Sequence, residues 1–222
     1  MTTIPSTRNK ATPAEQFDDL AQQRHANLMG MWIFLATELM LFGGVFTSFA
    51  VYRHAYPDVF AEAASHLDLV LGTLNTALLV TSSLFMTLAE RAVNAEKRRL
   101  ALTFLFVTIS IGIVFLGIKG YEWYLEYTEG LMPVLGLEFT YPGQHPERAQ
   151  MFFNFYYTLT GLHAVHMSLG MVVLTVLIVL TIRWRDPAKL GRQVQISGLY
   201  WAFVDVMWVF IFTSQYLLRT TS

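Results

Sequence analysis

The chain alternates long apolar stretches with short polar segments. Five apolar stretches lie near or above the ~20 residues that a helix needs to cross the hydrocarbon core of a bilayer. They run over residues 28–52, 67–89, 100–121, 151–182 and 194–218. Each predicts a helix, because a strand or loop exposed to lipid would leave backbone groups without hydrogen-bond partners. The pattern therefore predicts an all-α polytopic membrane bundle of five transmembrane helices.

The residues before the first stretch are polar and predict a separate segment. We expect residues 1–27 to form a tail, and residues 28–219 to form one five-helix transmembrane domain. Within the tail, Thr12 suits an N-cap, Pro13 the first helical position and Glu15 a capping box, so a short surface helix is expected from Pro13. The tail lacks the apolar core and cleavage site of a signal peptide, so insertion should be directed by the first span.

Composition agrees with a membrane protein. Of the 222 residues, 54% are hydrophobic and only 14% are charged, a balance that soluble domains of this length rarely reach. The chain contains no cysteine, which excludes disulfides, Cys-ligated zinc, iron–sulfur clusters and Cys-attached haem. A net charge of −1 indicates no nucleic-acid partner. We expect a multi-pass protein of the inner (cell) membrane.

The distribution of basic residues predicts the orientation, because loops rich in Lys and Arg stay in the cytoplasm. One side of the membrane receives eleven of them: Arg8, Lys10, Arg24, Arg91, Lys97, Arg98, Arg99, Arg183, Arg185, Lys189 and Arg192. The other side receives Arg53, Arg148 and Arg219. The N-terminus should therefore be cytoplasmic, and the C-terminus and the long connection over residues 122–150 should be external.

Few ionisable residues fall inside the spans, and because they are costly in lipid, such residues usually have a structural or functional role. Glu38 lies near the middle of the first span, where an ionised side chain costs roughly 2.5–3.5 kcal/mol. Burial raises the pKa of an acid, so both a neutral, hydrogen-bonded carboxyl and a role in proton handling stay open. Lys119 and Glu122 share one helical face, which favours a structural ion pair. Glu126 and Glu129 should be solvated beyond the membrane.

The last two spans contain a pair of histidines and a stripe of two tryptophans and one aspartate. His163 and His166 lie one turn apart on one face and could in principle share a metal, but two ligands do not complete a site. Hydrogen bonds to another helix or to a partner are the favoured interpretation. Trp201, Asp205 and Trp208 form one stripe of the last span, and Asp205 should face protein rather than lipid.

Five motifs in order resemble the helices of subunit III of haem–copper oxidases. They are "FLATELMLFGGVF", "LGTLNTALLVTSSLFMTLAE", "GIKGYEWYLEY", "FYYTLTGLHAVHMSLGM" and "GLYWAFVDVMWVFIF". Together they cover nearly everything from residue 29 to residue 218. Longer members of the family have seven spans, and this chain is similar to the five-span form that lacks the first two.

The resemblance implies an accessory subunit that binds no haem or copper itself. Its partners would be the catalytic subunit I, which holds these cofactors, and subunit II, with bound phospholipid as a further component. It would support assembly, sustained turnover and proton uptake, within a complex that passes electrons to oxygen and that can join a respiratory supercomplex. Cytochrome c oxidases, quinol oxidases and nitric oxide reductases all remain open as parent complexes.

The resemblance also carries over to single positions. Glu38 matches the family's buried glutamate, His163 and His166 its paired histidines, and Asp205 and Trp208 its "FVDxxW" motif. Ala202 departs from the pattern, because many members have histidine there. The missing first two helices put in doubt the lipid-filled cleft that longer members form.

Two other classes compete with this interpretation. A stand-alone proton or cation carrier would use Glu38, the Lys119–Glu122 pair and Asp205, although such carriers commonly show internal symmetry, which is not visible here. A dihaem cytochrome would need axial histidines on opposed helices. For an accessory subunit, we expect the ionisable groups to be hidden against the partner that holds the metals.

Overall fold

The protein is a bundle of long helices in a computed structural model that describes residues 20–133, 139–143, 145–184 and 186–217. The six helices in this part of the chain are α1 (Leu20–Ala55), α2 (Pro57–Ala64), α3 (Leu69–Asn94), α4 (Arg98–Thr128), α5 (Pro146–Arg183) and α6 (Pro187–Gln215). All except α2 are long and apolar enough to cross a membrane, and the described residues contain no strand. The prediction of an all-α, five-span membrane protein is confirmed.

The helix ends differ from the predicted spans. An apolar run marks only the part of a helix that lies in the hydrocarbon core of the bilayer. Each of the five long helices therefore continues beyond its predicted span at one end or at both. Side-chain caps fix two of the starts: the Asp68 carboxylate accepts hydrogen bonds from the backbone N–H groups of Val70 and Leu71, and Asp186 accepts one from Lys189. The surface helix expected from Pro13 lies outside the described residues.

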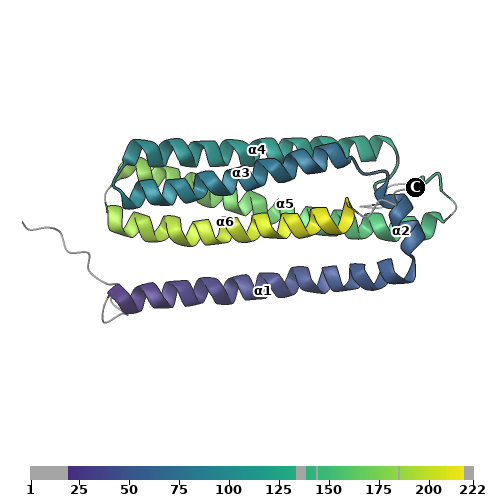
Figure 1. The fold of residues 1–222 in the computed structure, drawn as a ribbon, viewed down its shortest axis with the longest axis horizontal. Helices are drawn as coiled ribbons and strands as arrows, with labels where there is room; N and C mark the ends of the chain where they lie inside the picture. The colour runs from purple at the N-terminus through teal and green to yellow at the C-terminus, as the bar shows by residue number, and fades with distance from the viewer. Residues whose placement is uncertain (1–19, 134–138, 144, 185, 218–222) are drawn as a thin grey trace, which may run out of the picture.

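The short helix α2 was not predicted. Pro57 opens it and Asp58 lies in its first turn, both of which are common at helix starts, but α2 is too short and too mixed in polarity to give a membrane signal. It packs against α5, where the ring of Phe60 lies 5.6 Å from that of Phe152. The connection between α1 and α3 is therefore an ordered element (Figure 1).

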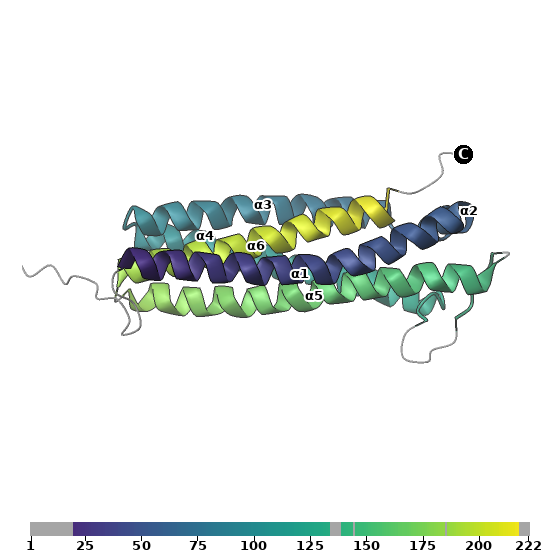
Figure 2. The same cartoon turned by 90° about the horizontal axis from the view of Figure 1, so that it is seen from below.

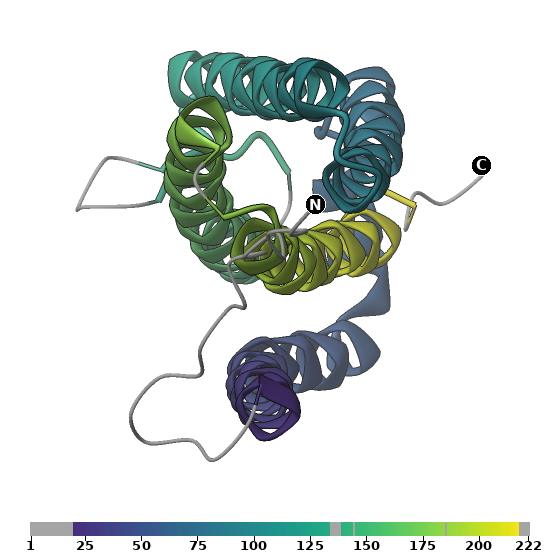
Figure 3. The ribbon, with the colours of Figure 1, turned by 90° about the vertical axis from the view of Figure 1, so that its left-hand side faces the viewer.

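Helices α3 to α6 form a closed four-helix ring. Seen from one end, α4, α3, α6 and α5 follow one another around a common centre, and each contacts both of its neighbours (Figure 3). The buried Trp201 of α6 lies in this centre, beside two glycines at which the helices come close. A Cβ atom added at Gly170 would lie 3.1 Å from its ring, and one added at Gly112 would lie 3.3 Å from it.

Helix α1 lies beside this ring rather than in it (Figures 1 and 2). It contacts α5 and α6 along one side and leaves its other faces open. In an apolar 18-residue window of α1, 11% of the residues are buried, whereas the corresponding windows of the other four spans are 28–44% buried. The core of the molecule is thus the α3–α6 ring, with α1 attached to its surface.

Candidate functional site

Glu38 of α1 is bound to His166 of α5. The Glu38 Oε2 atom lies 2.8 Å from the His166 Nε2 atom, and the other ring nitrogen, Nδ1, lies 2.8 Å from the backbone oxygen of Leu162. A carbonyl oxygen only accepts, so Nδ1 carries a hydrogen. A carboxylate facing an unprotonated Nε2 would place two acceptors together. One proton therefore lies between Glu38 and His166, either on the carboxyl group or on the imidazole.

Lys119 is the centre of a second site, inside the four-helix ring. Its Nζ atom donates to Glu122 Oε2 at 3.0 Å and to the hydroxyl oxygens of Tyr156 and Tyr216 at 2.6 Å each. The Tyr216 hydroxyl in turn donates to Glu122 Oε1 at 2.6 Å. All three ammonium hydrogens have acceptors, so the buried cation is fully satisfied. The structure brings together the predicted pair of Lys119 and Glu122 and adds tyrosines from α5 and from the end of α6.

Glu126 extends this network, and the expectation that it would be solvated was wrong. It is only 4% exposed, and its two carboxyl oxygens accept hydrogen bonds from Tyr156 at 2.7 Å and from Tyr157 at 2.5 Å. The sequence did hold a signal, because residues 119, 122 and 126 share one helical face, so an acid there follows the pair into the ring. Glu129, by contrast, is exposed.

The stripe on α6 faces α3. The Trp201 Nε1–H donates to Ser82 at 2.9 Å, the Trp208 Nε1–H donates to Thr76 at 3.0 Å, and the Ser83 hydroxyl donates to Asp205. The Asp205 residue is 6% exposed. Each of the three side chains thus has one hydrogen bond with a hydroxyl group of α3, whereas the Asp205 Oδ1 atom has no partner in the described part of the chain. Those α3 hydroxyls were not singled out from the sequence.

The two histidines have different surroundings. His166 reaches α1, whereas His163 points into the ring between Phe115 and Trp208, with ring centroids 5.6 and 5.2 Å away. Neither ring nitrogen of His163 has a hydrogen-bond partner. Across the described part of the chain, no three His, Cys, Asp or Glu side chains are grouped as metal ligands would be. The pair does not share a site.

The expectation that ionisable groups would be hidden against a partner was wrong for Lys119, Glu122 and Asp205. All three are at most 6% exposed within this chain alone. The four-helix ring has its own interior, and hydroxyl groups of Tyr156, Tyr216 and Ser83 supply hydrogen bonds to these buried groups, although the Asp205 Oδ1 atom has no hydrogen-bond partner among the described residues. For Lys119 and Glu122, contact with a partner is not needed to satisfy the charged groups.

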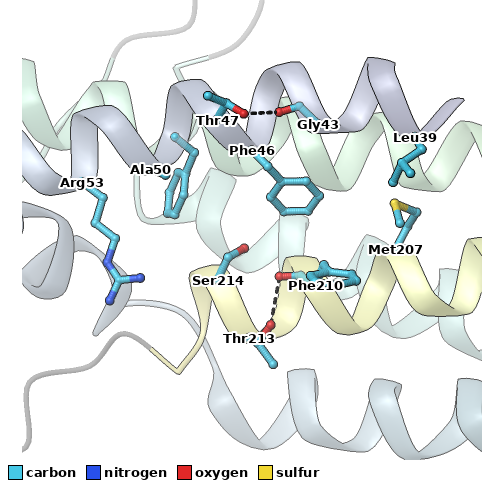
Figure 4. Close-up of a pocket in the computed structure, with 11 residues that line it drawn as sticks. Leu39, Gly43, Phe46, Thr47, Ala50, Arg53, Met207, Phe210, Thr213 and Ser214 are labelled. Atoms are coloured by element: carbon cyan, nitrogen blue, oxygen red, sulfur yellow. Dashed lines mark hydrogen bonds between the residues drawn. The ribbon is translucent and has the colours of Figure 1, made fainter. Parts of the chain in front are cut away.

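A groove of about 470 Å³ runs between α1 and α6. Its walls are mostly apolar, and the rings of Phe46 and Phe210 meet across it with centroids 6.3 Å apart. The Arg53 side chain lies at one end of the groove, and Thr213 and Ser214 line its α6 side (Figure 4). Nothing lies within 4 Å of the position that a Gly43 Cβ would take, so the groove has room there.

Comparison with known proteins decides the family. The family model described as cytochrome c oxidase subunit III matches residues 18–220. The chain belongs to this family. Subunit III relatives include proteins named "Probable quinol oxidase subunit 3". One, from Staphylococcus epidermidis, is 31% identical over 208 residues, which cover 92% of this chain and 95% of the relative. Another, from Staphylococcus aureus, is 29% identical over 202 residues, with 90% and 93% covered.

Ala202 is the position at which this chain departs from the pattern of the subunit III family. Ala202 lies on an exposed face of α6, next to the buried Trp201. A histidine in its place would point out of the ring rather than into it. The departure therefore leaves the internal hydrogen bonds of Trp201, Asp205 and Trp208 unaffected.

Proposed function

We propose that this chain is the non-catalytic accessory subunit of a haem–copper terminal oxidase. It binds subunit II and the catalytic subunit I, which holds the haem and copper, and it supports the assembly, stability and proton uptake of the catalytic subunit. The observation that carries the proposal is the family match along residues 18–220. The basic loops orient the chain with its N-terminus in the cytoplasm and its C-terminus outside.

The exposed faces of the spans suit this role. Helix α1 presents large apolar side chains to its surroundings, among them Trp32, Ile33 and Met40, each at least 60% exposed. Surfaces of this kind suit lipid or the apolar helices of another membrane subunit. Both a cytochrome c oxidase and a quinol oxidase accommodate the same accessory role, because the contacts with the electron donor lie on other subunits.

Purification of the tagged chain in mild detergent tests the proposal. We expect a larger haem-bearing subunit to co-elute with it, because the accessory role requires a stable complex. The competing carrier hypothesis uses Glu38, the Lys119–Glu122 pair and Asp205, which the structure places in three separate sites. A colourless chain that elutes alone and moves protons in liposomes would support the carrier instead.

We propose that the proton between Glu38 and His166 takes part in proton uptake. In Glu38→Gln the amide N–H can still donate to His166 Nε2, so α1 should stay attached, but the transferable proton is lost. We expect proton uptake by the complex to slow and its activity to decay faster during turnover. Glu38→Leu, which also loses the hydrogen bond, should in addition weaken the attachment of α1. Unchanged uptake and lifetime in Glu38→Gln would show that the carboxyl is structural.

We propose a phospholipid as the occupant of the groove between α1 and α6. The apolar walls suit an acyl chain, and the Arg53 guanidinium at the end of the groove suits an anionic phosphate. We expect Arg53→Gln to lower the number of phospholipids retained by the purified complex, measured by native mass spectrometry. The exposed Arg91, which does not line the groove, provides the matched variant Arg91→Gln. Equal lipid counts in the two variants would contradict the proposal.

A further inference from the structure

A continuous set of hydrogen bonds joins six buried side chains near the end of α4. The set consists of Lys119, Glu122, Glu126, Tyr156, Tyr157 and Tyr216. Glu126 is its outermost acid, two residues before α4 ends at Thr128. At the usual helical rise, Glu126 lies about 10 Å along the axis from Lys119. The network thus lies toward the end of the bundle at which α4 and α6 both finish.

The charges of this network do not balance. It contains one cation, Lys119, and two carboxyl groups, while α3 presents the uncharged Asn75 to the interior of the ring. On α5, His163 lies against aromatic rings and has no acceptor that would stabilise a second ring hydrogen. If both Glu122 and Glu126 were ionised, one buried negative charge would have no counter-charge, which is unfavourable away from water. Uptake of one proton removes that cost.

The contacts identify the carboxyl group that takes the proton. Glu122 lies 3.0 Å from the Lys119 ammonium, which favours its ionised form. Glu126 forms no ion pair with any described residue, and its partners are two tyrosine hydroxyls, of which Tyr156 also accepts a hydrogen bond from Lys119. We propose that Glu126 is a proton-binding site of this chain, which holds one proton shared with Tyr157 and releases it toward the end of the bundle.

The exchange needs only groups that are present and water. In the acid form, the Glu126 Oε2–H donates to the Tyr157 hydroxyl oxygen, and the 2.5 Å separation of these oxygens suits a short O–H···O bond. On release, the carboxyl hydrogen moves to the Tyr157 oxygen while the hydroxyl hydrogen of Tyr157 passes to a water molecule. Tyr157 is unchanged, Glu126 is left as a carboxylate that accepts from Tyr156 and Tyr157, and one proton has left. The site stores one proton whichever subunits bind the chain.

Infrared spectroscopy of the purified complex, with ¹³C-labelled glutamate, tests this site. Near neutral pH we expect Glu126→Gln to lose one carbonyl stretching band of a protonated carboxylic acid, of roughly one group's intensity. The matched variant Glu129→Gln removes the exposed acid three residues further on and should keep the band. A band of equal intensity in wild type and Glu126→Gln would overturn the proposal.

A second variant covers the case in which Glu126→Gln does not assemble. Tyr157→Phe keeps the carboxyl group but removes the oxygen with which it shares the proton. The acid band should persist and shift in frequency, because the carboxyl O–H loses its acceptor. An unshifted band in Tyr157→Phe would contradict a proton shared with that hydroxyl. Neither measurement depends on the identity of the partner subunits, so the proposed function can fail separately.

Discussion

Lys119→Met should destabilise the protein by about 3–5 kcal/mol, the usual cost of removing one partner of a buried ion pair. The substitution nearly preserves the length of the side chain but removes the donor of three hydrogen bonds, to Glu122, Tyr156 and Tyr216. The carboxyl of Glu122 then stays in the ring without its cation. We expect a large fall in the thermal unfolding midpoint of the purified protein and in the amount that accumulates in the membrane.

Two further variants separate charge from packing at Lys119. Lys119→Met combined with Glu122→Gln removes the cation and its ionised partner together, and should recover much of the lost stability because no unpaired charge remains. Lys97→Met removes an exposed lysine just before α4 and should change stability by no more than about 0.5 kcal/mol. A Lys119→Met protein as stable as Lys97→Met would show that the buried network does not hold the ring together.

Trp208→Ala should cost about 3–5 kcal/mol, the range measured when large aromatic side chains are removed from protein cores. The Trp208 ring is fully buried and lies edge-on to Phe115, with centroids 4.8 Å apart, while its Nε1–H donates to Thr76. Removing it leaves a cavity between α3, α4 and α5 and leaves His163 without one of its two ring contacts. Helices in lipid associate largely through such packing, so the ring should loosen.

The chain supplies a matched tryptophan for comparison. Trp32 on α1 is 60% exposed, and Trp32→Ala should leave the free energy of unfolding of the isolated chain within about 0.5 kcal/mol of wild type. Trp208→Phe should fall between wild type and Trp208→Ala, because it keeps most of the buried ring and loses the hydrogen bond to Thr76. If the two alanine variants were equally stable, Trp208 would not be part of the core that the structure shows.

The apolar runs predicted the five spans because length and hydropathy alone decide whether a helix can cross a bilayer. They did not predict that α1 lies outside the ring. The 18-residue apolar windows of α1 and α3 have the same mean hydropathy, although a much smaller share of the α1 window is buried. In lipid both the outside and the interior of a bundle are apolar, so hydropathy does not distinguish a helix at the periphery from one in the core.

The site was predicted only as far as single helices allow. The spacing of Lys119 and Glu122 placed them on one face, and extending that face by one turn would have included Glu126. Tyr156, Tyr157 and Tyr216 could not be assigned in this way, because they come from α5 and from the end of α6. Which helix faces which is a property of the folded ring, and a pattern within one segment does not contain it.

Whether this chain carries redox centres is tested most directly by counting haem and copper in the purified complex before and after the chain is removed with detergent. We expect the haem spectrum and the copper content to stay with the remaining subunits, and the released chain to be colourless and helical. The stripped complex should start at nearly its normal rate and lose activity sooner during turnover. Haem or copper that leaves with this chain, or a tagged chain that elutes without any haem-bearing partner, would contradict an accessory role.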